Sequence, residues 1–203
     1  MSRPLPDHAA ARQAQVAEEL LNRITAAVAS GLPADRELGR LFRTHREYGS
    51  RDRRFFASLV FSCFRWKGWL DTIADRPLAV RAAIAYRLDG HPATDAVDRL
   101  AMLPEAKEPL DNLDAKGRQF ARWCGQTAHP SPEQVIPDGW LERLTRTGSG
   151  PGDAIGRRLL EAFQTRPPTW IRVRASASES VRQACAALGI GRASCRERVC
   201  YVV

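Results

Sequence analysis

The chain of 203 residues has 44% hydrophobic and 27% charged residues, a balance that argues against intrinsic disorder. Charged residues interrupt its apolar runs before the roughly 20 residues that a membrane span needs, and its first residues lack the apolar core of a secretory signal. We therefore expect a cytoplasmic protein with no membrane partner. The formal net charge of +8, mostly from arginine, favours a polyanionic partner, although GC-rich genes also encode many Arg and Ala residues.

The first two helices follow from apolar residues that recur at three- and four-residue steps. One long helix is predicted from Asp7 onward, with Asp7 as its cap, and residues 31–33 end it. A second helix is predicted over residues 34–47, with arginines on the side opposite its leucines.

A third helix, over about residues 51–74, is the most apolar element of the sequence. Gly49 ends the preceding helix, Ser50 is the predicted cap, and Asp52 lies in the first turn, where the helix dipole favours a carboxylate. Apolar side chains cover more than half of the circumference, which predicts a position in the middle of a bundle. A narrow stripe on this helix stays polar: Arg54, Ser58, Ser62 and Arg65.

The rest of the chain changes character at a proline-rich stretch. Helices are predicted at 78–88, 93–102 and 112–126, with no strand-like alternation before residue 127, and the prolines of 129–137 predict a linker. After it come a short helix near 140–144, a helix at 152–163, a strand at 169–175 and a helix at 179–188. One strand cannot satisfy its own backbone groups, so we expect this α+β unit to be incomplete.

The predicted fold is therefore mainly α, a helical bundle followed by the beginning of a small α+β domain. The boundaries are 1–127 for the bundle, 128–137 for the linker and 138–188 for the α+β unit. Five cysteines without CxxC spacing and four scattered histidines make a metal site unexpected. Cys63 and Cys124 lie in apolar helical patterns, which favours buried hydrophobes over reactive thiols.

Two stretches resemble a known family. Residues 45–71, HREYGSRDRRFFASLVFSCFRWKGWLD, resemble the signature of the RsmB/Sun family of RNA cytosine-5 methyltransferases, which lies in an N-terminal helical domain similar to the transcription factor NusB. Residues 136–190 resemble the next region of that family, with Arg174 where the family has Asn. With these two stretches included, the resemblance covers about residues 8–188.

The resemblance implies a modular enzyme in which a NusB-like bundle and a small α+β domain hold ribosomal RNA. A separate Rossmann-like domain would bind S-adenosylmethionine and supply two cysteines for catalysis. The sequence has no glycine-rich cofactor loop after a strand and no Pro-Cys motif. We therefore expect a monomeric chain, truncated before the catalytic domain, with no catalytic residue, no cofactor of its own and no activity alone.

Residues 190–199, IGRASCRERV, resemble a peptide translated from a short-read sequencing adapter. This resemblance implies that residues 189–203 are a non-native tail. The alternative is an Arg-rich tail that binds RNA.

The placement of charge carries the functional prediction. Residues 36–67 contain nine basic and three acidic residues, most densely at 50–54, where free amides at a helix N-terminus also favour phosphate. The alternative to RNA binding is that Asp52 bridges arginines and that the other basic residues only keep this helix face soluble. Arg51 is expected to pack through its stem, and Trp66, Trp69, Trp140 and Trp170 to lie in the core rather than stack on bases. The candidate RNA-binding residues are Arg43, Arg46, Arg51, Arg53, Arg54, Arg65 and Lys67.

The leading hypothesis is the RNA-recognition part of an rRNA cytosine-5 methyltransferase that depends on S-adenosylmethionine. Two other classes stay open. One is a stand-alone NusB-like module acting in antitermination, which would end near residue 126 and would lack the second unit at 136–188. The other is a helical protein-interaction domain whose arginines bind an acidic partner.

Overall fold

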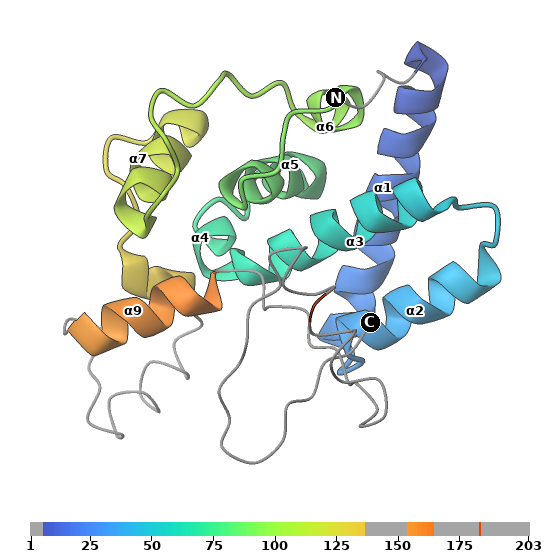
Figure 1. Cartoon of the computed structure of the whole chain (residues 1–203), viewed down its shortest axis with the longest axis horizontal. Coiled ribbons are helices and arrows are strands. Elements are labelled where there is room, and N and C mark those ends of the chain that lie inside the picture. The colour runs from blue at the N-terminus through green and yellow to red at the C-terminus, as the bar shows by residue number, and fades with distance from the viewer. Residues whose placement is uncertain (1–5, 137–153, 165–182, 184–203) are drawn as a thin grey trace. The chain divides into compact units, whose positions relative to one another are not determined.

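The computed structural model describes residues 6–136, 154–164 and 183 (Figure 1). As predicted, the described residues are mainly helical, and no strand occurs among them. The predicted helix near 140–144, the strand at 169–175 and, apart from residue 183, the helix at 179–188 lie outside these residues, as do Trp140, Trp170 and the tail. All the helices below belong to one compact unit, Met1–Thr165.

The first two helices, α1 (Asp7–Ala29) and α2 (Ala34–Thr44), match the predicted elements with different ends. The prediction of Asp7 as a cap is wrong, because Pro6 takes the cap position and Asp7 lies in the first turn. There its carboxylate still faces the positive end of the helix dipole. Helix α2 ends three residues early because His45 leaves helical dihedral angles, with φ −100° and ψ 76°.

The predicted single helix over 51–74 is wrong, because the chain breaks at Trp66 into α3 (Ser50–Arg65) and α4 (Lys67–Asp71). The Trp66 ring is fully buried, and its Nε1 donates a hydrogen bond to Asp89 Oδ1 at 2.7 Å. This hydrogen bond between residues 23 positions apart lies at the break between α3 and α4. At the other end Gly49, rather than Ser50, takes the cap position.

Helix α5 (Leu78–Leu88) has the predicted bounds and is the most completely buried helix of the unit. It packs against α3, α1, α7 (Leu113–Cys124) and α6 (Asp95–Leu100). Its small side chains let the neighbouring helices approach closely. Cys63 and Cys124 are buried as predicted, and so are Trp66 and Trp69.

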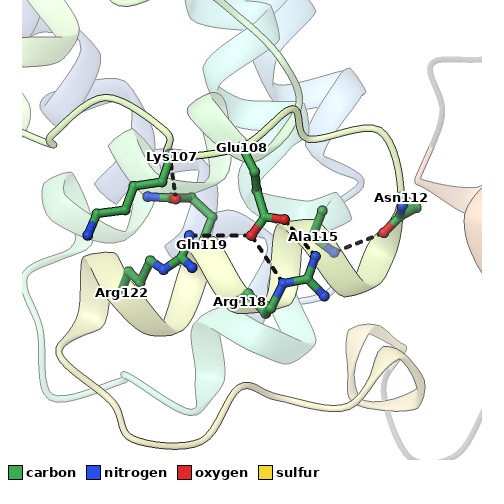
Figure 2. A network of polar contacts seen from close by, with 7 residues as sticks. All are labelled: Lys107, Glu108, Asn112, Ala115, Arg118, Gln119 and Arg122. Carbon is green, nitrogen blue, oxygen red and sulfur yellow. Dashed lines mark hydrogen bonds and ion pairs between the residues drawn. The ribbon is translucent and has the colours of Figure 1, made fainter.

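Both α6 and α7 are shorter than predicted, and each begins at a side-chain cap. Thr94 Oγ1 accepts from Val97 N at 3.3 Å, and Asn112 Oδ1 accepts from Ala115 N at 2.9 Å. The irregular chain between the two helices is held by polar contacts to α7, which Figure 2 shows around Glu108. Lys107 N also donates to Gln119 Oε1 at 3.2 Å.

The described part of the predicted linker is folded against the bundle. A short 3-10 helix, η1 (Pro132–Val135), packs on α4 and α7. Trp69 Nε1 donates to the carbonyl of Ser131 at 2.9 Å, and a Cβ on Gly68 would overlap the carbonyl oxygen of Gln134. Residues 131–136 are thus not a free linker, because they contact α4 and α7. The domain boundaries stay a prediction.

The predicted helix at 152–163 is present as α9 (Ala154–Phe163), which packs against η1. Leu160 is buried in the core, and Arg157 Nη1 binds Asp114 Oδ2 of α7 at 2.8 Å. Helix α9 therefore extends the bundle on the side formed by η1 and α7.

Candidate nucleic-acid interface

Arg65 is not available to a partner. Its guanidinium forms an ion pair with Asp89, and its side chain is 17% exposed. Asp89, whose side chain is 4% exposed, also accepts from Ser62 Oγ at 2.6 Å and from Trp66 Nε1. Over the C-terminal half of the polar stripe of α3, Ser62 and Arg65 therefore bind Asp89 inside the bundle and do not face solvent.

Two more of the predicted RNA-binding residues have partners within the unit. Lys67 is exposed, and its Nζ lies 2.8 and 2.6 Å from the carboxylate oxygens of Asp71. Arg53 is half-buried, donates from Nε to the carbonyl of Tyr48 at 2.8 Å and lies over the ring of Phe42. Both contacts occupy charge or hydrogen-bond donors that Lys67 and Arg53 would otherwise offer to a phosphate.

Arg43, Arg46 and Arg54 lie where α2 ends and α3 begins, and all three are exposed. Within the described part of the chain, none of them forms an ion pair with an acid. We call these three residues the junction arginines. Arg51, predicted to pack through its stem, is also exposed in the first turn of α3.

Asp52 ties the start of α3 to α1. One carboxylate oxygen accepts from Gln13 Nε2 at 2.7 Å, and the other accepts from Gly49 N at 3.3 Å, which closes the first turn of α3. The alternative interpretation made Asp52 a bridge between arginines. These two contacts give it a structural role instead, which leaves the junction arginines to solvent.

Other arginines of the bundle have nearby carboxylates. Glu37, with a side chain 9% exposed, binds Arg40 and Arg23, and the hydrogen bond from Arg40 is the main cause that lowers its pKa. Glu108, in the chain that precedes α7, binds both Arg118 and Arg122 of α7 (Figure 2), and the hydrogen bond from Arg118 chiefly lowers the pKa of Glu108. The junction arginines differ from both groups in having no such carboxylate among the described residues.

A cleft of about 330 Å³ adjoins the first turn of α3 and was not predicted from the sequence. It lies between α1, the turn at 45–49 and α3, and its lining includes Arg12, Val16, Glu47, Tyr48, Asp52 and Phe56. Partial burial raises the pKa of Tyr48. The pKa of Glu47 is lowered, first by its own backbone amide and then by His45. The local signal that marks this place is an aromatic residue inside a basic turn.

The described residues offer little for metal or thiol chemistry. They contain no group of three His, Cys, Asp or Glu side chains able to hold a metal ion. Burial raises the pKa of Cys63 to about 12 and that of Cys124 to about 11, so both stay thiols at neutral pH. Of the helices in the described ranges, none has the length and apolar character needed to cross a membrane.

No protein-family model, curated protein or solved structure matches this chain. The likeness of residues 45–71 and 136–190 to the RsmB/Sun family therefore stays an interpretation of those residues. What the geometry adds is the division of the basic residues into those with partners in the bundle and the junction arginines.

Proposed function

We propose that the helical bundle binds structured ribosomal RNA in the cytoplasm, and that the chain is the RNA-recognition part of an S-adenosylmethionine-dependent rRNA cytosine-5 methyltransferase. The observation that carries the RNA-binding proposal is the group of junction arginines, which are exposed and have no acid partner among the described residues. Arginines in this state release counterions when they bind phosphates, which makes the affinity depend on salt.

Arginine also favours nucleic acid over a generic anion, because its planar guanidinium donates two parallel hydrogen bonds to phosphate oxygens. The methyltransferase part of the proposal rests on the resemblance alone, which covers 136–190 as well as 45–71. That second stretch favours it over a stand-alone antitermination module. A protein-interaction domain that binds an acidic partner is the remaining alternative.

The proposal assigns no methyl transfer to the described residues. Their two cysteines are buried thiols with raised pKa values, so neither fits the role of a nucleophile beside S-adenosylmethionine. In an enzyme of this kind, a separate domain would bind the cofactor and carry the reaction. The bundle would then contribute affinity and position.

The test compares two triple variants that lose the same charge. Arg43, Arg46 and Arg54 are changed to Ala in one, and Arg118, Arg122 and Arg157, which have acid partners, are changed to Ala in the other. Binding of an rRNA fragment is titrated at several salt concentrations, and circular dichroism checks that both variants fold.

The first variant should bind about tenfold more weakly, and the slope of log affinity against log salt should become shallower by about 2 to 3. The second should stay near wild type in both quantities. Equal losses in the two variants would reject the junction as an RNA site. The protein-interaction alternative would be favoured if the wild-type chain binds no RNA but binds an acidic peptide, and if the first variant loses that peptide binding.

A further inference from the structure

We propose that the cleft between α1 and the first turn of α3 binds one unstacked guanine base. This inference rests on the proposed function, since it names what the junction arginines would deliver to the cleft. The volume of about 330 Å³ lies at the lower end of the roughly 300–1,000 Å³ typical of small-molecule sites. A ligand the size of a nucleoside therefore suits it better than a larger one.

The apolar side of the cleft is aromatic. Tyr48 is half-buried, and its ring meets that of Phe56 edge to face, with centroids 5.3 Å apart and an interplanar angle of 71°. On its own turn the ring of His45 stacks on Tyr48 at 5.2 Å. Phe56 is buried in the core, so Tyr48 is held by a rigid neighbour. A pre-positioned ring of this kind stacks on an unpaired base with little loss of side-chain freedom.

The polar side presents acceptors. Gln13 and Asp52 are hydrogen-bonded to each other. Glu47, at the rim with a side chain 54% exposed, is left as the acceptor for a ligand. His45 Nδ1 lies 2.9 Å from one oxygen of Glu47, and a carboxylate keeps further acceptor sites. Because the pKa of Glu47 is lowered, the group is an ionised, acceptor-only partner at neutral pH.

Guanine fits the ionised carboxylate of Glu47 better than uracil or adenine does. Its Watson–Crick edge carries two adjacent donors, N1–H and the N2 amino group, which match the two oxygens of a carboxylate. Uracil has carbonyl oxygens on both sides of its single donor, and adenine has one amino donor beside an acceptor. Arg12 is exposed at the same cleft, where its guanidinium can bind the phosphate of the same nucleotide.

The first experiment uses mononucleotides and the full chain. NMR titration with GMP, IMP, AMP and guanosine separates the base from the phosphate, and inosine lacks only the N2 amino group. GMP should bind about tenfold more tightly than IMP and AMP, because a missing donor leaves one carboxylate oxygen unpaired. Arg12→Gln should weaken GMP and leave guanosine unchanged.

The matched variants then assign the contacts. Glu47→Gln should remove the difference between GMP and IMP, whereas Glu18→Gln, at an exposed acid of α1 outside the cleft, should keep it. Tyr48→Leu should weaken GMP about tenfold through lost stacking, and Tyr48→Phe should not. If Tyr48→Leu does not fold, Glu47→Gln decides the question alone.

The second experiment places the same base in RNA hairpins that carry one unpaired guanosine, inosine or adenosine. A preference for the guanosine hairpin that depends on Glu47 supports guanine binding in the cleft. Equal binding of GMP and IMP to the wild-type chain overturns it, even where the junction arginines still govern RNA affinity. Selective GMP binding, with RNA affinity that ignores the junction arginines, would keep the cleft and reject the proposed function.

Discussion

The two ends of α3 carry the same residue type on the same face and use it in different ways. Arg54 and Arg65 are eleven residues apart, which is close to three helical turns, so the periodicity places them alike. Arg54 is exposed with no acid partner among the described residues, whereas Arg65 is bound to the buried carboxylate of Asp89. The difference comes from α5, whose C-terminal end places Asp89 beside only one of them.

The comparison shows that a basic stretch overstates the charge that a partner meets. Within residues 36–67, Arg40, Arg65 and Lys67 have carboxylate partners, and Arg53 binds a backbone carbonyl. Charge density along the sequence therefore identifies 36–67 as the basic region, and the tertiary contacts determine which of its basic side chains are available to a partner.

Replacing each of the two arginines by alanine is the sharpest test. Arg65→Ala leaves Asp89 buried without its ion pair and should lower the free energy of unfolding by about 3 kcal/mol. Arg54→Ala should change it by less than about 0.5 kcal/mol and weaken RNA binding instead. Urea denaturation of both variants provides the measurement. Equal destabilisation by the two substitutions would remove the distinction between the ends of α3.

Gly68→Ala tests whether residues 131–136 are anchored to the bundle. The added Cβ would overlap the carbonyl oxygen of Gln134, and such overpacking should cost about 1–3 kcal/mol. Limited proteolysis should then cut within 129–137 faster than in the wild type. Gly39→Ala is the control, because its Cβ meets only Arg43 Nη1 at 3.5 Å and a helix interior favours alanine by about 0.5–1 kcal/mol. Unchanged stability and cleavage in Gly68→Ala would mean that the chain at Gln134 shifts to make room for the Cβ at no cost in stability.

Glu108→Gln should create a second group of available arginines. The change breaks the ion pairs with Arg118 and Arg122 (Figure 2), at a small cost in stability because these side chains are partly exposed. RNA affinity should rise a few-fold, and the salt slope should steepen by about 1 to 2. If the affinity stays the same, the absence of an acid partner does not explain RNA binding by the junction arginines.

The smallest effect concerns Glu37, which binds Arg40 and Arg23. Its pKa is below the ordinary 4.5 in the folded chain, so the unfolded chain takes up the proton first as the pH falls. The stability that Glu37 contributes is therefore present above pH 4.5 and is lost as the pH falls through the lowered pKa. The gap in unfolding free energy between wild type and Glu37→Gln should shrink over that range. A gap that is independent of pH between 6 and 3, approximate bounds for this test, would contradict the assignment.

The candidate site was predictable only in part. The basic turn at 43–54 stands out in the sequence because its arginines are dense and follow a helix end. The cleft does not, because its walls come from α1 and from residues 47–56, which no local spacing connects. Tyr48 within the turn is the one local signal, and it gains meaning only when Val16 and Phe56 lie beside it.

The mainly α character of the described residues, the bounds of α5 and the burial of Trp66, Trp69 and Cys63 could all be predicted from the sequence. Those features depend on apolar spacing along one helix, which the chain carries locally. The packing of the helices sets the rest: the end of α3 before Trp66, the contact of residues 131–136 with α4, and the partners of the individual arginines. Each of these depends on a contact between groups distant in sequence, such as Trp66 with Asp89 or Trp69 with Ser131. A buried polar group must find its partner, and that partner is set by how the helices pack.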